Sequence, residues 1–289
     1  EVEQLGDLKT RMVGTGPFAL KEYTPNVSLV LTRNPSYFVP GRPLVDEIQW
    51  LIITDESTYI SSFRARQVDI LPLQLAIQPH SAESLKQAVP DARVVEVPFY
   101  GWRHIAFRTD RKELPFADRR VRQAISLALD RQAMVGVLAR GKAVLDGPIS
   151  ASLVDWVLPV DRLGPAGRYY KRDLAEARRL LADAGYPNGF KFSLKSTQQL
   201  GPIHAQWLEM VKANLAEVGV EVNLVWEEFT TFVTTTYVGK YEEAMAGQSA
   251  PSVEADEFLA VWYGPGNPRN QSYVNDPVLN EMVARQRRS

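Results

Sequence analysis

The feature that most constrains this chain is a strand, a helix and a second strand in direct succession. Apolar and polar residues alternate over 190–195, which is the period of a half-buried strand. Apolar residues then recur at helical spacing from Ile203 to Val218, and Gly219 leads into an apolar strand over 220–226. Two strands joined in this way are nearly always parallel neighbours with a right-handed crossover. The sequence therefore predicts an α/β fold, in which ligands bind outside the carboxyl ends of the strands.

Two further helices carry clear start signals. Asp118 is placed to cap a helix whose apolar face lies within 121–128. Asp173 and Glu176 form an Asp-x-x-Glu capping box before a second helix, which Gly185 is expected to end. After residue 110 the chain thus alternates between helix and strand.

The first hundred residues differ, because short β-prone runs dominate them. Two of these runs, 18–23 and 27–33, are separated by Pro25-Asn26 and predict a hairpin. No Gly/Ser-rich linker divides this part from the rest, and we interpret the chain as two α/β lobes. The other expected elements are an apolar stretch at 48–53, helices at 56–66 and 81–89, and strands at 68–71, 93–97 and 102–107.

Composition narrows the functional classes. The 33 basic and 34 acidic residues give a net charge of -1, which provides no electrostatic footprint for nucleic acid. The absence of cysteine excludes disulfides, thiolate metal sites and a cysteine nucleophile. The longest apolar run, Phe258 to Tyr263, is too short to span a bilayer, and we expect any targeting segment to have been removed. A basic run from Arg103 to Arg122 is interpreted as solvated helix faces rather than a phosphate-binding patch.

Catalytic signals are weak. The stretch 247–251 approaches the G-x-S-x-G nucleophile elbow but ends in Pro251, where the sharp turn requires glycine. A hydrolase built on Ser249 remains the alternative from another functional class, with His80, His104 or His204 as its base. We expect His104 to be a hydrogen-bonded structural residue and His204 to lie at the surface or its boundary. No pair of histidines has metal-ligand spacing, so we expect no metal and no cofactor.

Large aromatic side chains beside glycines are more informative. Tyr100 and Trp102 flank Gly101, Trp262 lies close to Gly264, and Trp156 belongs to another predicted loop. Together they suit an aromatic-lined cleft for a small polar or amphipathic ligand.

Several stretches jointly resemble the extracellular solute-binding proteins of peptide and nickel ABC transporters, the dipeptide/oligopeptide-binding family. The most specific is the helix entry Pro115 to Ile125, with sequence PFADRRVRQAI. The turn Gly14 to Phe18, the stretch Arg33 to Phe38 and the helix from Asp173 to Tyr186 agree in order and spacing. The resemblance covers nearly the whole chain.

This resemblance implies a two-lobed periplasmic-binding-protein type II (dipeptide-binding-like) fold, present here in part. Residues 1–103 would be the later, strand-rich part of lobe I and residues 104–289 the α/β lobe II. Early lobe I and a C-terminal return segment would be absent, which makes the chain a fragment. The expected function is the substrate-binding component of an ABC importer, which captures a peptide or other small solute by clamp closure and catalyses no reaction. The expected partners are that ligand and a membrane permease, and no nucleic acid. The protein is expected to be a monomer in the periplasm or outside the cell, associated with the membrane through the transporter.

The ligand-reading segment of the family resembles Y-D-x-x-x-x-G-W-x-x-D-Y-x-D-P and aligns here from Tyr241 onward without gaps. Gln248 replaces the family's Trp, and Pro251 replaces the Asp that pairs with a peptide's α-ammonium group in peptide binders. An oligosaccharide, another amphipathic solute or a chelated metal therefore stays open beside a peptide. The predicted ligand-binding residues are Tyr100, Trp102, Trp156, Gln248, Ser249, Ala250 and Pro251.

Overall fold

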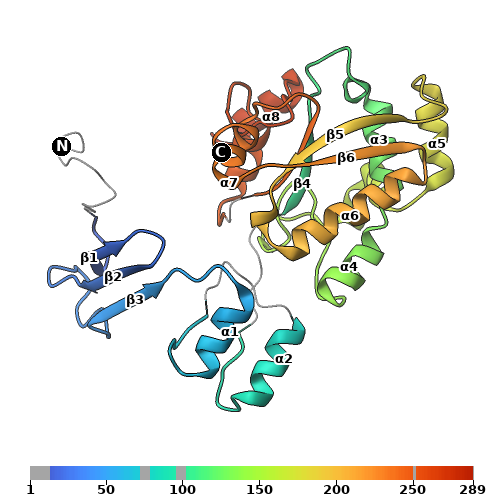
Figure 1. The fold of residues 1–289 in the computed structure, drawn as a ribbon. Coiled ribbons are helices and arrows are strands. Elements are labelled where there is room, and N and C mark those ends of the chain that lie inside the picture. The colour runs from blue at the N-terminus through green and yellow to red at the C-terminus, as the bar shows by residue number, and fades with distance from the viewer. Residues whose placement is uncertain (1–13, 72–78, 96–101, 250–251, 289) are drawn as a thin grey trace. The chain divides into compact units, whose positions relative to one another are not determined.

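A computed structural model describes residues 14–71, 79–95, 102–249 and 252–288 of the chain. The chain divides into two compact units, residues 1–96 and 97–289. Figure 1 shows a small sheet with two helices in the first unit and a larger sheet with most of the helices in the second.

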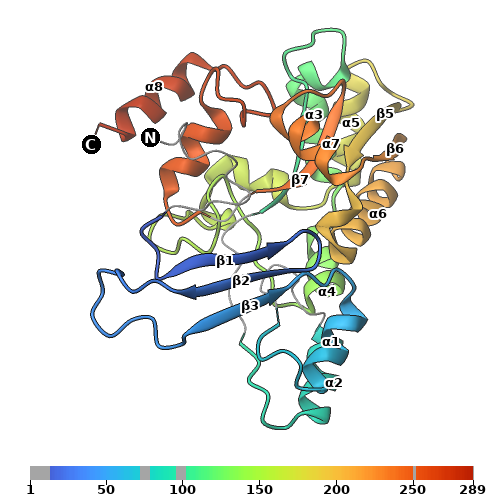
Figure 2. The same ribbon diagram turned by 60° about the vertical axis from the view of Figure 1, so that its left-hand side comes forward.

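The first unit begins with an antiparallel sheet of three strands in the order β1-β2-β3 (Figure 2). The strands are β1 (Phe18–Thr24), β2 (Ser28–Arg33) and β3 (Glu47–Leu51). The predicted hairpin is confirmed, because β1 pairs with β2 around a turn in which Asn26 takes a φ of 60°. Asparagine tolerates this left-handed backbone better than most residues.

Two helices complete the first unit, as predicted. In α1 (Glu56–Arg64), the side chain of Asp55 accepts a hydrogen bond from the backbone N–H of Thr58 and so caps the helix. The second helix is α2 (Pro79–Ala88). Their small core consists of Tyr59, Ile60, Leu85 and Val89.

The strands predicted at 68–71 and 93–97 are not confirmed. Residues 68–71 and 93–95 form no strand, and residues 96–97 lie outside the described part. A β-prone run becomes a strand only where a neighbouring strand offers its backbone groups. Ile70 is instead exposed.

The second unit contains a four-stranded sheet in the order β4-β7-β5-β6. The strands are β4 (Arg103–Phe107), β5 (Phe190–Ser196), β6 (Val220–Trp226) and β7 (Ala244–Gln248). The predicted βαβ unit is confirmed, since β5 and β6 are parallel and α6 (Pro202–Ala216) joins them. A glycine precedes each of these two strands, and a Cβ atom on Gly189 would lie only 1.9 Å from the carbonyl oxygen of Gly219.

The predicted capped helices are present and build the main core. Asp118 accepts from the N–H of Arg120 at the start of α3 (Arg119–Ala128). Asp173 accepts from the N–H of Glu176 at the start of α5 (Leu174–Asp183). Only half of the capping box forms, because the Glu176 carboxylate pairs with Arg179.

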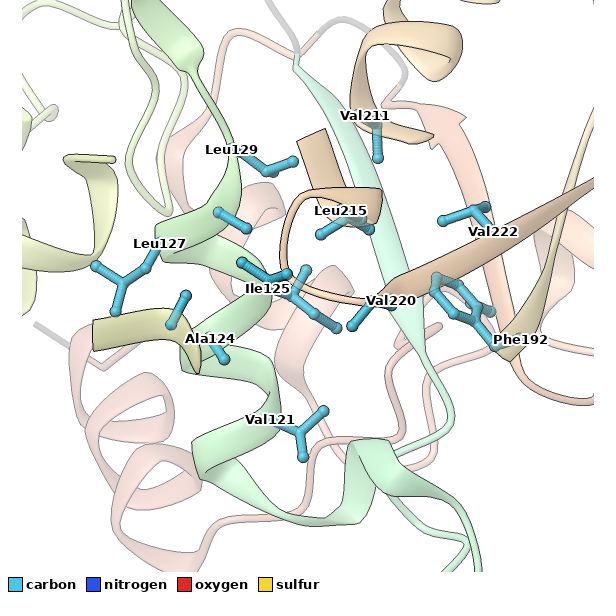
Figure 3. Close-up of a cluster of buried hydrophobic side chains, with 14 of the residues drawn as sticks. Val121, Ala124, Ile125, Leu127, Leu129, Phe192, Val211, Leu215, Val220 and Val222 are labelled. Atoms are coloured by element: carbon cyan, nitrogen blue, oxygen red, sulfur yellow. The ribbon is translucent and has the colours of Figure 1, made fainter. Parts of the chain in front are cut away.

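These helices, with α6, cover the sheet with apolar side chains. Figure 3 shows Val121 and Ile125 of α3 gathered with Phe192 and Val220 of the strands and Leu215 of α6. The remaining elements of the second unit are α4 (Arg131–Ala139), α7 (Phe229–Thr234), α8 (Pro277–Gln286), a π-helix at Glu257–Val261, and short 3-10 helices at Pro115–Ala117, Val160–Arg162, Gly164–Tyr170, Gln198–Leu200 and Thr236–Val238.

Candidate functional site

The larger sheet has one edge at which three strands end and the fourth begins. β7 and β6 run parallel to β5, whereas β4 runs antiparallel to β7. The end of β7 therefore meets the start of β4, where Arg103 lies directly opposite Gln248. Open α/β sheets bind ligands outside this kind of edge. We call it the carboxyl edge and define it by residues 102–103, 196–197, 226–227 and 248–249.

Trp102 and Ser249 extend the pairing of β4 and β7 by one step. The backbone N–H of Trp102 donates to Ser249 Oγ at 2.9 Å, and the backbone N–H of Ser249 donates to the carbonyl oxygen of Trp102 at 2.9 Å. The Ser249 residue is only 2% exposed, so its hydroxyl supports the backbone of Trp102. The two predicted residues thus meet at the carboxyl edge, and direct contact of Ser249 with a ligand stays a prediction.

The indole ring of Trp102 packs into an aromatic cluster. Its centroid lies 4.5 Å from that of Phe258 and 5.8 Å from that of Trp262. The π-helix places Phe258 four residues before Trp262, and both side chains are buried. Trp262, which the sequence pattern grouped with the rings of a cleft, is therefore a core residue that supports Trp102.

Trp156 lies on a loop attached to the same cluster. Its backbone N–H donates to the carbonyl oxygen of Leu153, and Leu153 packs with Phe258 and Trp262. The Trp156 residue itself is 60% exposed, which leaves its ring available to a ligand. Tyr100, Ala250 and Pro251 lie outside the described residues.

Gln248 is the last residue of β7 and combines a fixed backbone with an uncommitted side chain. Its carbonyl oxygen accepts a hydrogen bond from the hydroxyl of Tyr237 at 2.7 Å. The preceding Gly247 makes room for that ring, because a Cβ atom there would lie 3.2 Å from the Tyr237 ring. The Gln248 amide group is half-buried and makes no hydrogen bond within the described part of the chain. It can therefore bind a polar group of a ligand.

The two histidines of the second unit, His104 and His204, are structural. Gln271 donates its amide N–H to the carbonyl oxygen of Tyr237, so its Oε1 accepts from Nε2 of His104 at 2.8 Å. Burial lowers the pKa of His104 to about 4, and the expected structural role of this residue is confirmed.

His204 corrects an expectation, because it is fully buried rather than at the surface. Its Nε2 lies 2.9 Å from Oγ of Ser196, which donates in turn to the carbonyl oxygen of Ala246. Burial and the positive charge of Arg103 lower the pKa of His204 to about 3. His204 and His104 are thus bonded to partners other than Ser249, and the His80 side chain lies outside the described part. This arrangement gives the hydrolase alternative no support.

Three of the six arginines of the basic run have local side-chain partners. Arg108 pairs with Asp110 at 2.7 Å and Arg120 pairs with Asp118 at 2.6 Å. Arg122 donates to a backbone carbonyl at 2.6 Å. Only 13% of the Arg108 side chain is exposed, so the expectation of solvated helix faces is wrong at this position.

Two properties of the described residues bear on cofactors and membranes. No group of three or more His, Cys, Asp or Glu residues within 14–71, 79–95, 102–249 and 252–288 is arranged to hold a metal ion. Within the same ranges, no helix has the length and apolar character needed to cross a bilayer.

The sequence profile of the bacterial extracellular solute-binding proteins, family 5 (middle region), matches residues 2–270. Among curated relatives, heme-binding protein A of Haemophilus influenzae is 26% identical over 96% of this chain and 50% of its own length. The chain thus spans about half the length of the curated relatives it matches.

Solved structures show the same fold. The periplasmic binding protein DppA of Helicobacter pylori, in complex with the peptide STSA, superposes with a TM-score of 0.80 at 22% identity, over 96% of this chain and 52% of the other. The binding protein AgaA of A. tumefaciens R10, in complex with agropinic acid, superposes with a TM-score of 0.79 at 22% identity, over 100% and 57%. The expected fold class, a partial two-lobed periplasmic-binding-protein fold of the dipeptide-binding type, is confirmed.

Proposed function

Because the chain belongs to family 5 of the bacterial extracellular solute-binding proteins, we propose that it captures a peptide or another small solute for an ABC importer. The observation that carries this proposal is the match of the family profile to residues 2–270. The protein works as a monomer in the periplasm or outside the cell, and a membrane permease receives its ligand. It binds no nucleic acid and catalyses no reaction.

Capture proceeds by clamp closure. Residues 1–103 belong to the later part of lobe I and residues 104–289 to lobe II, and the solute binds between the lobes. Contacts available only when both lobes touch the solute shift the population toward the closed form. The permease recognises that closed form.

The carboxyl edge of the larger sheet contributes the lobe II side of the binding site. The free amide of Gln248 and the exposed ring of Trp156 contact the solute, and Tyr100, Ala250 and Pro251 complete the surface. Trp102 adds a ring held in place by its aromatic neighbours, and Ser249 fixes the backbone of Trp102. A site that contributes both amide and indole groups suits a ligand that combines polar groups with apolar faces.

The class of solute is broader than peptides. The relatives and similar structures include a heme-binding protein, a peptide complex and an agropinic acid complex. A peptide, an oligosaccharide or another amphipathic solute each remains compatible with Gln248 and the tryptophans of this chain.

Native mass spectrometry of the purified 289-residue chain tests the proposal. We expect a noncovalent one-to-one complex with a small solute, either retained from the cells or bound from a panel of trialanine, cellotriose and mannopinic acid. Absence of any such complex would contradict solute capture. A covalent adduct of a serine hydrolase probe on Ser249 would contradict the non-catalytic role.

The Gln248→Ala variant tests the site. We expect its affinity for the retained solute to fall at least tenfold while the midpoint of thermal unfolding is unchanged, because the Gln248 amide has no partner within the described residues. Gln206→Ala, on the exposed side of α6, is the matched control and should bind as the wild type does. A loss of stability with unchanged affinity would show that Gln248 is structural.

A further inference from the structure

Arg103 lies at the carboxyl edge, and its side chain has no counter-ion among the described residues. It is the first residue of β4, and its side chain forms no ion pair or hydrogen bond with any other described residue. In the same basic run, Arg108 and Arg120 each pair with an aspartate within 2.7 Å. The charge of Arg103 is therefore uncompensated at the carboxyl edge.

The strand register places this charge beside Gln248. Arg103 and Gln248 are directly opposite in the antiparallel pair of β4 and β7, so their side chains leave the sheet on the same face as neighbours. This is the face that α6 covers, since Ser196 Oγ bonds both His204 of α6 and the carbonyl oxygen of Ala246 in β7. A guanidinium group and a free amide thus lie together, next to the start of α6.

The Arg103 residue is exposed to solvent, so its guanidinium group is accessible to a ligand. Desolvation lowers the pKa of Arg103, whereas hydrogen bonds to aspartates raise the pKa of Arg108 and Arg120. The charge of Arg103 also disfavours protonation of the buried His204, which places the two groups close together.

Other charges at the carboxyl edge do not neutralise Arg103. Glu227 lies at this edge, but its carboxylate is bonded to Lys195 and Thr236. The adjoining segment 248–253 contains no ionisable side chain. An exposed guanidinium group without a counter-ion can form charge-assisted hydrogen bonds with a bound anion.

We propose that Arg103 and Gln248 form a subsite for an oxyanion group, a carboxylate or a phosphate, of the captured solute. The proposal rests on the proposed function and narrows it to acidic solutes. The guanidinium group offers two parallel N–H donors that match a carboxylate or phosphate, and the Gln248 amide supplies a third donor beside them.

A side-chain NMR titration of the 289-residue chain tests the subsite. Sodium acetate and inorganic phosphate serve as probes, at ionic strength kept constant with sodium chloride. The Nε–Hε signal of Arg103 is assigned by its loss in Arg103→Gln. We expect this signal to shift saturably with acetate, with phosphate or with both, and the stronger response identifies the preferred oxyanion. The signal of Arg285, an exposed arginine of α8 whose side chain has no partner among the described residues, should not saturate.

Variants of Arg103 test whether the subsite contributes to solute affinity. In Arg103→Gln we expect the affinity for the retained solute to fall at least tenfold. Arg103→Lys keeps the charge but loses the paired donors, so we expect a smaller loss, and Arg285→Gln should bind as the wild type does. If Arg103→Gln fails to fold, the wild-type titration decides.

Failure of this subsite is distinguishable from failure of solute capture. Retention of a solute with no response of Arg103 to either probe would overturn the subsite and keep the importer role. A saturable response of Arg103 in a chain that retains no solute would support the subsite and contradict solute capture.

Discussion

The two sheets of this protein follow equally clear sequence patterns, yet their apolar faces have different environments. In the second unit, Phe192 and Leu194 of β5 alternate with polar residues and are buried, Leu194 completely. In the first unit, the apolar side chains of β1–β3 remain half-buried or exposed, and Trp50 is 46% exposed. Alternation thus fixed which residues share a face but not whether that face is covered.

The strand registers make the difference explicit. In the first sheet, Leu31 of β2 lies opposite Leu20 on one side and Ile48 on the other. The next row on the same face contains Tyr23, Leu29 and Trp50, and none of these six side chains is fully buried. In the second unit, the crossover between β5 and β6 is itself a helix, so α6 covers the sheet that it connects.

The largest expected effect compares one leucine from each sheet. Leu194→Ala should lower the free energy of unfolding of the second unit by about 3–5 kcal/mol, because it leaves a cavity in a closed core. Leu31→Ala should lower that of the first unit by about 1 kcal/mol or less, because the site is partly solvated already. Hydrogen exchange of the strand amides measures each unit separately. Equal effects at the two positions would refute the difference in packing.

A second expected effect concerns pH and the buried histidines of the second unit. The pKa of His204 is lowered to about 3 and that of His104 to about 4, so the unfolded chain binds more protons than the folded one below about pH 6.5. The free energy of unfolding should therefore fall between pH 6.5 and pH 4.5, by roughly 2–4 kcal/mol in total. Urea unfolding at a series of pH values measures this loss.

Histidine variants test whether His104 and His204 cause the loss of stability at acidic pH. The double variant His104→Gln, His204→Gln should have a shallower pH dependence than the wild type. His80→Gln, which changes the histidine of the first unit, is the matched control and should keep the wild-type slope. An unchanged slope in the double variant would show that other groups carry the pH dependence.

The smallest expected effect compares two ion pairs. In the second unit, Glu227 pairs with Lys195 at 3.3 Å and accepts from Thr236, and its side chain is mostly buried. Glu227→Gln should lower the free energy of unfolding by about 1 kcal/mol. The matched variant Glu47→Gln breaks the solvated pair with Lys21 in the first unit and should cause no measurable change. Chemical unfolding of both variants at low and high salt checks this, and a larger effect at Glu47 would contradict it.

Local signals in the sequence predicted most of the elements correctly. The caps at Asp118 and Asp173 depend on backbone groups within three residues, so their partners are already specified in the sequence. The hairpin and the βαβ unit involve only elements adjacent along the chain. The predicted residues Trp102, Gln248 and Ser249 also come together, because β4 and β7 pair at the carboxyl edge.

The missed features depend on contacts between distant segments. His204 is buried because it packs against strands from other parts of the chain. Ser196 of β5 bonds its ring, and the charge of Arg103 in β4 acts on it. Trp262 joins the core because its segment packs on Trp102, 160 residues earlier in the chain. Arg103 was one of six arginines in a basic run, and only the pairing of β4 with β7 shows that its charge lies beside Gln248.

By itself, the sequence determined the fold class, the strand and helix order and the residues that line each face, because these follow from periodicity and capping within a few residues. Only the tertiary structure decided which faces are covered, which aromatic rings are free, and which charge lacks a partner. The physical reason is that burial and charge compensation depend on groups from distant parts of the chain. Local sequence patterns do not specify these long-range contacts.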